Sequence, residues 1–539
     1  MKKYFFGFIV ILAAGILVRV IFVLYYPMCF DEAFFGLTAK HISEFKEFPI
    51  FLSKAHYGGV LSCYIGAVLF KLFGVSLILF RSIVLLVYWP LFAIFSYLFC
   101  RVFRGRAHGL LVLLFACLTP PLITGLTSFN PGIYPETLAV NGILFFLTAK
   151  WLKANDRRRE NKILFLMAFF AGFGSWLTPG TSYFLFMMFI LLWLKDKKFY
   201  ISFRFAGVIL FFCLGFLPAI IYNIQYPGAS LFRFAGRILH LERSALASPG
   251  LVNTVVAQII WRLSAIPACF SGMLGLIFKM ASEISLFTGP VKFLVSLAGL
   301  FYFCALGLAL FNRRKILAGI LRKKTPVNAL DGADICLIYL FCFSVLFSAV
   351  VCDPLNIGLD RYVAPLYIIF LYLLADLFIW VKKYGKSLFL FSIILLVSIN
   401  ILANAQKLKN SFSESPGNYK KLEKFLLAQR LLYGYSDNDV AHSLNFISNE
   451  ELIFSPLLIT QFEERYPRYS EIVNTKDNLS YIFNALKHSH ARRFFEDFLN
   501  HNNIAFKREN IYPFAVYYGL SRVIRPRDVV FPRAIKEEE

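Results

Sequence analysis

A succession of about eleven long apolar stretches, separated by short polar loops, constrains what this chain can fold into. A helix rises about 1.5 Å per residue, so roughly 20 apolar residues cross a bilayer core of about 30 Å. Hydrophobic residues make up 58% of the 539 residues and charged residues only 16%. These values exclude an ordinary soluble enzyme, a disordered protein and a disulfide-rich secreted module. We predict a mainly α, polytopic helical membrane protein with spans near 4–26, 82–100, 108–125, 133–151, 163–178, 180–194, 203–223, 291–311, 332–351, 362–380 and 386–404.

The basic residues gather in the loops between the apolar stretches. The formal net charge is +24, which by itself is compatible with nucleic-acid binding. If the N-terminus lies inside, however, every dense basic cluster falls on the inner side of the membrane, as the positive-inside rule requires. The charge therefore indicates membrane orientation, and no nucleic-acid partner is expected. The clusters lie at 101–106, 150–162, 195–198, 313–324 and 382–386.

This orientation leaves two large loops outside. In the first outer loop (27–81), residues 31–45 and 60–73 have the apolar rhythm of helices. The second outer loop (224–290) carries apolar and arginine residues near its start, which predicts an interfacial helix there. Its stretch 266–287 is apolar enough to be re-entrant or to form two further short spans. The total is therefore about 11–13 spans.

The composition changes near residue 405, and we expect a domain boundary there. Residues 1–405 form the transmembrane domain, and residues 406–539 form a small external α/β domain. Helical periodicity and β-branched or aromatic runs locate its elements. Helices are predicted at 422–430 and 491–500, and strands at 431–435, 451–454 and 514–518.

Asp31 and Glu32 follow the first apolar stretch directly and are the strongest local feature. Two adjacent acids at an apolar boundary carry a desolvation cost unless they are solvated, paired, protonated or bound to a metal ion. They also stand at the start of a predicted helix, where the helix dipole favours negative charge. A helix cap and a reactive site are therefore both compatible with the sequence.

Further polar residues lie at the outer ends of spans. Arg361 precedes a late span and can grip a phosphate at headgroup level, or pair with Asp353 or Asp360. Glu136 opens another span as a cap or a site acid. His56 precedes Gly58-Gly59, which permits close backbone approach. The chain has no G-x-x-x-x-G-K-[ST], H-E-x-x-H or G-x-S-x-G sequence, which disfavours the ATP-driven pumps and hydrolases that use them.

Four motifs in order resemble those of the membrane-embedded glycosyltransferases of the C superfamily. The resemblance is strongest to the bacterial branch related to dolichyl-phosphate-mannose protein mannosyltransferases and the aminoarabinose transferases of lipid A. It covers roughly residues 1–405. The chain departs from that pattern in lacking the Lys-Pro pair of the aminoarabinose transferases, and Ser62 stands where some relatives carry an acid. The motifs are Phe30-Asp31-Glu32-Ala33, His56-Tyr57-Gly58-Gly59 with Leu72-Phe73-Gly74 and Arg81, Tyr134-Pro135-Glu136, and Asp360-Arg361-Tyr362-Val363-Ala364-Pro365.

The resemblance implies an inverting glycosyltransferase. Such an enzyme moves a sugar from a polyprenyl-phosphate carrier to an acceptor hydroxyl on the outer face of the membrane. Asp31 is then the general base, within hydrogen-bond reach of the acceptor hydroxyl. Glu32 would orient Asp31, hold a divalent cation or cap the helix. A divalent cation is thus a possible cofactor, with Asp31 and Glu32 as its candidate ligands.

The resemblance also implies where substrates bind. Arg361 and Tyr362 are the first candidates for the donor phosphate, whose developing charge needs cationic stabilisation. Further residues are expected to bind substrate, and the acceptor can be a glycan, a lipid or a protein. The family branch places the chain in the cytoplasmic membrane, multi-pass, with its active site outside. The remaining candidates are Lys54, Arg233 and Arg237 for the donor phosphate and His56, Tyr57, Glu136 and Asp353 for substrate.

Two other classes of function remain open at this point. A lipid-linked sugar transporter or flippase would place ionisable residues near the middle of its spans. Most notable ionisable residues lie at outer ends instead, with Arg19 and Asp376 as exceptions. A non-catalytic scaffold, whose C-terminal domain binds partners in the cell envelope, is the third reading.

Overall fold

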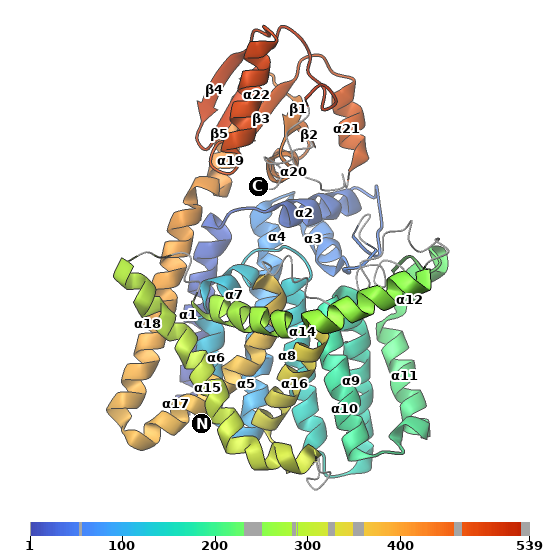
Figure 1. The fold of residues 1–539 in the computed structure, drawn as a ribbon, viewed down its shortest axis with the longest axis vertical. Coiled ribbons are helices and arrows are strands. Elements are labelled where there is room, and N and C mark those ends of the chain that lie inside the picture. The colour runs from blue at the N-terminus through green and yellow to red at the C-terminus, as the bar shows by residue number, and fades with distance from the viewer. Residues whose placement is uncertain are drawn as a thin grey trace.

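The computed structural model describes residues 2–52, 56–230, 251–282, 287, 289–321, 329–348, 360–457 and 466–529. Helices form a bundle in the lower part of Figure 1, and the end of the chain forms a small sheet domain above it. The expected fold class, a mainly helical membrane protein with a small C-terminal α/β domain, is confirmed.

The helices of the bundle follow the predicted apolar stretches. Helix α5 continues α4 through a π-helical turn at Val84–Tyr88. In chain order the helices are α1 (Lys2–Tyr25), α4 (Leu77–Ile83), α5 (Trp89–Arg104), α6 (Arg106–Cys117), α7 (Pro121–Leu126), α8 (Tyr134–Leu152), α9 (Arg157–Leu177), α10 (Ser182–Lys195), α11 (Phe203–Gly215), α12 (Leu217–Gln225), α14 (Leu251–Ser282), α15 (Gly289–Leu321), α16 (Gly332–Leu346), α17 (Tyr367–Val381) and α18 (Lys386–Ser411).

Proline breaks two of the predicted spans. Within the described ranges, five helices are long and apolar enough to cross a membrane, or six if the bent pair α11–α12 is one span. The predicted span 108–125 consists of two helices, because Pro120 and Pro121 interrupt the backbone ladder between α6 and α7. Helices α11 and α12 meet at an angle of 69° next to Pro218. The length criterion therefore supports fewer crossings than the 11–13 predicted.

The two helices predicted in the first outer loop are present. They are α2 (Phe30–Ser43) and α3 (Leu61–Phe73), and they lie between the bundle and the sheet domain. The apolar stretch 266–287 of the second outer loop does not form two short spans. It belongs mostly to one long helix, α14, which contains Pro267 and lies across the bundle in Figure 1. The interfacial helix predicted near its start falls on 231–250, outside the described residues.

Helices α9 and α11 approach each other through glycine. A side chain at Gly172 would meet the carbonyl oxygen of Phe212 at 2.1 Å, and one at Gly215 would meet that of Phe169 at the same distance. Only a residue without a Cβ permits this backbone contact, which is the way small residues join helices in membranes.

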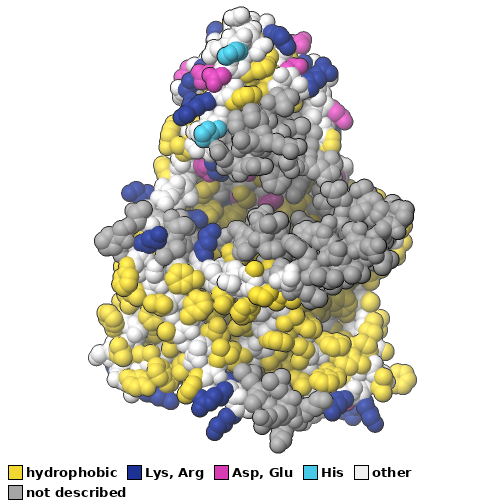
Figure 2. Space-filling view, viewed as in Figure 1, with side chains coloured by type: hydrophobic (Ala, Val, Ile, Leu, Met, Phe, Trp, Pro, Cys, Tyr) yellow, Lys and Arg dark blue, Asp and Glu magenta, His cyan; other side chains and the backbone are white. Residues whose placement is uncertain are grey.

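The predicted basic loops lie together at one end of the bundle. Exposed lysine and arginine side chains appear at the lower end in Figure 2, below a wide hydrophobic zone, and the sheet domain lies at the opposite end. The predicted parity of the loops is therefore consistent with the arrangement of the helices. The exposed cations in these loops include Arg101, Arg106, Arg157, Arg158, Arg159, Lys197, Lys198, Lys382 and Lys383.

The C-terminal domain contains a five-stranded mixed sheet with the order β2-β1-β3-β5-β4. Strand β1 pairs in parallel with β2 and β3, whereas β5 is antiparallel to β3 and β4. The predicted strands at 431–435, 451–454 and 514–518 correspond to β1, β2 and β5, and both predicted helices are present. The elements are α19 (Pro416–Ala428), β1 (Tyr433–Ser436), α20 (Asn438–Ile447), β2 (Ile453–Pro456), α21 (Pro467–Asn474), β3 (Ser480–Asn484), α22 (Ser489–His501), β4 (Lys507–Ile511) and β5 (Phe514–Tyr518).

Candidate active site

A buried ion pair between Glu32 and Arg81 fixes the start of the first outer loop. Both side chains are fully enclosed. Arg81 donates from Nε to Oε1 of Glu32 at 2.9 Å and from Nη2 to Oε2 at 2.6 Å, and the backbone N–H of Asn130 donates to Oε1 at 2.8 Å. This position favours a structural role for Glu32 over the catalytic or cation-binding role expected for it. Arg81 also donates to the backbone carbonyls of Val23, Tyr26 and Pro27.

Asp31, the neighbour of Glu32 in the sequence, instead meets Arg361. The Asp31 side chain is 27% exposed, and Nη1 of Arg361 donates to its Oδ2 at 3.4 Å. The guanidinium carbon of Arg361 lies 5.3 Å from the ring centre of Tyr134, which packs near Tyr362. The Nε of Arg361 is buried and has no hydrogen-bond partner among the described residues. The fold thus unites an acid and a cation that are 330 residues apart in the sequence.

The C-terminal domain covers the helix that carries Asp31. The first residue of α2, Phe30, donates its backbone N–H to Oδ1 of Asp439 at 3.0 Å, whereas the N-cap residue Cys29 supplies no side-chain bond. Asp439 therefore caps α2 from another domain. A side chain at Gly36 would meet the Phe446 ring at 2.7 Å, so glycine permits the close contact of α2 with α20. Figure 2 shows a hollow between this domain and the bundle, with hydrophobic and acidic side chains in view.

A second set of polar contacts attaches the C-terminal domain to α2. Glu450 accepts hydrogen bonds from Lys40, from Nε2 of His41 at 3.1 Å and from the Tyr469 hydroxyl at 2.8 Å. The other ring nitrogen of His41 lies 3.2 Å from Oε1 of Glu47. His41 is 12% exposed and Glu450 is 15% exposed, so these charges are only weakly screened by solvent.

These contacts predict that the domain docks less tightly at alkaline pH. Burial opposes the charged form of His41, but hydrogen bonds to Glu450 and Glu47 outweigh it and raise its pKa to about 9. Protonated His41 then stabilises docking fully below its free pKa of about 6.5, and that contribution is lost as the pH rises through about 9. Hydrogen–deuterium exchange, corrected for its intrinsic pH dependence, is expected to be faster in α2 and α20 at pH 9.5 than at pH 6.5.

A His41→Gln variant is the control for this pH dependence. It is expected to show the same protection of α2 and α20 at both pH values. Glu450 adds an acid limit, because hydrogen bonds from His41 and Lys40 outweigh its burial and hold its pKa well below the usual range. Its contribution is present above about pH 4.3 and is lost at lower pH. If the variant keeps the wild-type difference between pH 6.5 and 9.5, this role of His41 is wrong.

Glu136 is enclosed between α8 and α3. It is fully buried at the start of α8, where it accepts a hydrogen bond from Ser62 of α3. The Tyr88 hydroxyl lies 3.2 Å from the same Ser62 oxygen. The expected contact of Glu136 with substrate is therefore not supported by its position. Ser62, which departs from the family pattern, instead serves as the partner of this carboxyl group.

The other predicted site residues fall into two groups. His56 Nδ1 lies 2.6 Å from the hydroxyl of Tyr222, so the first loop reaches α12. Tyr57 is partly buried against the apolar core around α2 and α3. Lys54, Arg233, Arg237 and Asp353 are outside the described residues.

The acids at the start of α2 do not form a cation site with two carboxylates. Among the described residues, no three His, Cys, Asp or Glu side chains come together as metal ligands. Glu32 is occupied by Arg81 and Asn130, which leaves Asp31 as the only acid of the predicted pair that points toward Arg361. Among the described residues, this arrangement offers a divalent cation the carboxylate of Asp31 but not that of Glu32, and the mechanism proposed below is written without a cation.

Solved structures of lipid-linked sugar transferases resemble the whole chain in fold. ArnT from Cupriavidus metallidurans, in a crystal structure bound to undecaprenyl phosphate, superposes with a TM-score of 0.58 at 11% identity, covering 95% of this chain and 98% of ArnT. The chain has the GT-C glycosyltransferase fold. The apo oligosaccharyltransferase of Archaeoglobus fulgidus shares this fold with a TM-score of 0.52 at 12% identity, covering 91% of this chain and 70% of the archaeal protein. No protein-family model and no curated protein sequence matches the chain.

Several residues that shape the candidate site carry no clear signal in the sequence. Arg81 appears only as part of a motif, although it forms the main contact of Glu32. Asp439 lies in a polar stretch of the C-terminal domain and gives no sign that it caps α2. Tyr134 precedes the proline of a recognised motif, yet its ring position beside Arg361 depends on the fold.

Proposed function

We propose that this protein transfers a sugar from a polyprenyl-phosphate carrier to an acceptor hydroxyl at the end of the bundle that faces the C-terminal domain. The proposal rests on the contact between Asp31 and Arg361 in a chain with the GT-C fold. ArnT was crystallised with undecaprenyl phosphate, the kind of carrier that the proposal requires. Because the basic loops lie at the opposite end of the bundle, we place the C-terminal domain outside the membrane.

Asp31 acts in this mechanism as the general base. The acceptor oxygen attacks the anomeric carbon, the bond from that carbon to the phosphate oxygen breaks, and the hydroxyl proton passes to a carboxylate oxygen of Asp31. The polyprenyl phosphate leaves with the bonding electrons, and the anomeric configuration inverts. Asp31 suits this role because it is partly exposed, whereas Glu32 beside it is enclosed and paired. A base must lie about 2.6–3.2 Å from the oxygen that it deprotonates.

Arg361 stabilises the charge that develops on the leaving phosphate. Its unbonded Nε supplies a donor, and its weak 3.4 Å contact with Asp31 can be exchanged for a phosphate oxygen. Donor binding would then draw Arg361 toward the phosphate and away from the Asp31 carboxylate. The stacked Tyr134 keeps the guanidinium at the edge of the bundle, where the carrier lipid can stay in hydrocarbon.

The ionisable residues that could support a transporter or flippase do not form such a site. Arg19 is fully buried, but it lies over the Trp89 ring and donates to Thr127 and to the carbonyl of Cys117. Asp376 accepts two hydrogen bonds from Arg104. Both exceptions to the outer-end pattern are therefore engaged in contacts between helices, which supports a structural role for them.

The test is a transfer assay with the purified full-length chain in liposomes. Polyprenyl phosphates carrying different labelled sugars are supplied with an envelope extract as the source of acceptor. Label that moves from carrier to extract, with inverted anomeric configuration, supports the proposal. Label that crosses the bilayer while still attached to its carrier supports the flippase instead, and neither event with any donor contradicts both enzymatic transfer and transport.

Replacing Arg361 is expected to weaken binding of the carrier phosphate. A hydrogen bond to a charged group contributes about 1.5–3 kcal/mol, so Arg361→Gln should raise the dissociation constant for undecaprenyl phosphate roughly 10- to 100-fold. Arg361→Lys keeps the charge and loses the planar donor pair, so it should have an intermediate effect. Native mass spectrometry at several lipid concentrations measures both. Equal affinity in all three proteins would remove Arg361 from the phosphate site.

A further inference from the structure

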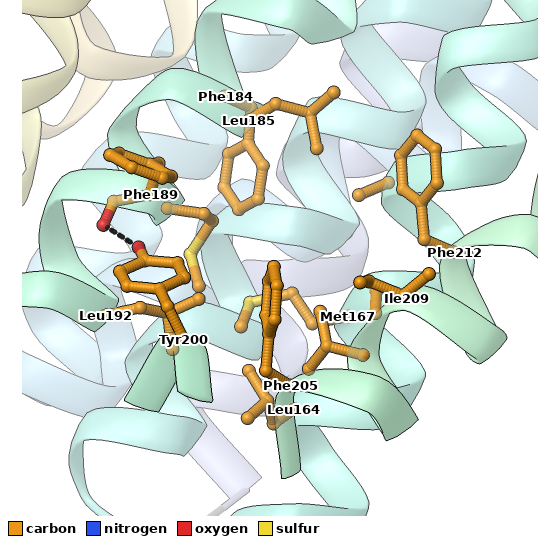
Figure 3. A pocket seen from close by; sticks show the side chains of 14 residues that line it. Leu164, Met167, Phe184, Leu185, Phe189, Leu192, Tyr200, Phe205, Ile209 and Phe212 are labelled. Carbon is orange, nitrogen blue, oxygen red and sulfur yellow. Dashed lines mark hydrogen bonds between the residues drawn. The ribbon is translucent and has the colours of Figure 1, made fainter. Parts of the chain in front are cut away.

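An apolar cavity lies in the half of the bundle that is farthest from Asp31. It has a volume of about 210 Å³ and opens between α9, α10 and α11 (Figure 3). Leu164, Met167 and Ala168 line it from α9, Met188 from α10, and Phe205 and Phe212 from α11. The backbone contact at Gly172 and Gly215 closes α9 against α11 at the end nearer the C-terminal domain. The two helices also meet nearer the basic end, where a side chain at Gly207 would lie 2.7 Å from the Phe165 ring. The cavity therefore lies between this pair of helices and α10.

The cavity opens toward the surface of the bundle that faces lipid. Phe189 and Ile209 both line it, and they are 55% and 47% exposed. Large apolar side chains at this depth are exposed to hydrocarbon in a membrane-spanning chain. A lipid chain can therefore reach the cavity sideways from the bilayer without passing through the protein.

A polar cavity with basic side chains adjoins the apolar one. Leu192 lines both, and the polar cavity also includes Arg157, Lys195 and Arg204. Tyr200 lines the apolar cavity, and its hydroxyl donates to the carbonyl of Phe189 at 2.5 Å (Figure 3). The apolar wall is thus continuous with a group of three cations at the basic end of the bundle.

The polar cavity contains three cations and only two acids, Glu160 and Asp196, so positive charge remains. Glu160 accepts a hydrogen bond from Nη2 of Arg204 at 2.6 Å, and its other carboxylate oxygen lies 3.4 Å from Nζ of Lys195. Asp196 accepts a hydrogen bond from the backbone N–H of Lys198, so its carboxylate stabilises the turn after α10. Arg157 is exposed, and the Nε of Arg204 is buried without a hydrogen-bond partner among the described residues. Exposed basic neighbours on the flanking loops add to the positive field, namely Arg158, Arg159, Lys197 and Lys198.

We infer that this surface binds an anionic phospholipid. One fatty-acyl chain fills the cavity between α9, α10 and α11, and the phosphate rests against Arg157, Lys195 and the free donor of Arg204. Basic pockets between membrane helices recognise anionic headgroups in this way. The site lies at the end of the bundle opposite α2, the helix that carries Asp31, so it is separate from the proposed site of the sugar carrier.

The test is native mass spectrometry of the full-length protein, titrated with phosphatidylglycerol and with phosphatidylcholine of the same acyl chains. Wild type is expected to bind one phosphatidylglycerol at least 10-fold more tightly than phosphatidylcholine. The Arg157→Gln/Lys195→Gln variant should lose that preference, and Ala168→Phe, which fills the cavity, should weaken both lipids. Lys383→Gln, a basic residue at the same end outside the cavity, is the matched control and should behave as wild type.

Three results would overturn the inference. They are equal affinity of the wild type for both lipids, the same loss in Lys383→Gln as in the double variant, and displacement of phosphatidylglycerol by undecaprenyl phosphate at equal concentration. Arg157→Gln alone guards against misfolding, because its side chain is exposed and a merely structural effect of that change is small. It should retain monodispersity and still lose several-fold in phosphatidylglycerol affinity.

Discussion

The Asp31→Asn variant is expected to lose sugar transfer by about 10²- to 10⁴-fold, the usual contribution of a general base. Asparagine keeps the size of the side chain and can still accept a hydrogen bond from Arg361, but it cannot take up the acceptor proton. The initial rate of transfer from a labelled polyprenyl-phosphate sugar, at saturating donor, measures the effect. Binding of undecaprenyl phosphate should be unchanged or tighter, because Arg361 no longer faces a negative partner.

Asp439→Asn is the matched control for this experiment. Its side-chain oxygen can still accept the N–H of Phe30 and cap α2, so the change removes a nearby charge without touching the proposed base. We expect its rate to stay within a few-fold of wild type. A rate in Asp31→Asn that matches this control would contradict the mechanism, and attention would pass to the acids that the structure places elsewhere or does not describe.

Much of the helical framework could be predicted because its signal is local. Apolar periodicity locates α2 and α3, and the distribution of lysine and arginine places the loops at a common end. The same reasoning fails where a buried or an edge position hides the pattern. Every residue of β3 is buried, so its polar and apolar residues do not alternate by exposure, and β4 is almost wholly exposed and begins with Lys507, Arg508 and Glu509.

The candidate site depends on contacts that no local pattern contains. The motifs single out Asp31 and Arg361 separately, and their meeting follows from the way α2 and the start of the late helix pack. The two adjacent acids look alike in the sequence, yet one is enclosed by Arg81 and the other is partly exposed. Likewise, α2 is capped by Asp439 of the C-terminal domain, which is more than 400 residues away in the sequence.

The Glu32–Arg81 pair is enclosed, whereas the Asp31–Arg361 pair is partly exposed. We therefore expect the largest effect on stability from a substitution in the enclosed pair. Arg81→Met is expected to lower the free energy of unfolding by about 3–5 kcal/mol, because it leaves the Glu32 carboxylate buried without its cation. Denaturant unfolding in mixed micelles measures the change. Arg361→Met, the same substitution in a pair with side chains 40% and 27% exposed, should cost less than about 1 kcal/mol. It should nevertheless impair transfer, whereas any folded Arg81→Met protein should keep its carrier affinity.

The stability lost in Arg81→Met can come from the unpaired Glu32 charge or from the lost hydrogen bonds to backbone carbonyls. The double variant Glu32→Leu/Arg81→Met separates these two causes. Replacing both partners removes the unpaired charge, and an apolar pair of similar volume is often as stable as a buried ion pair. Recovery should nevertheless be partial, because the carbonyls of Val23, Tyr26 and Pro27 and the N–H of Asn130 still lose their partners. If the double variant is as unstable as Arg81→Met, those backbone bonds rather than the Glu32 charge hold the loop. If it regains most of the stability and still transfers sugar, Glu32 is structural and Asp31 is the acid that the reaction needs.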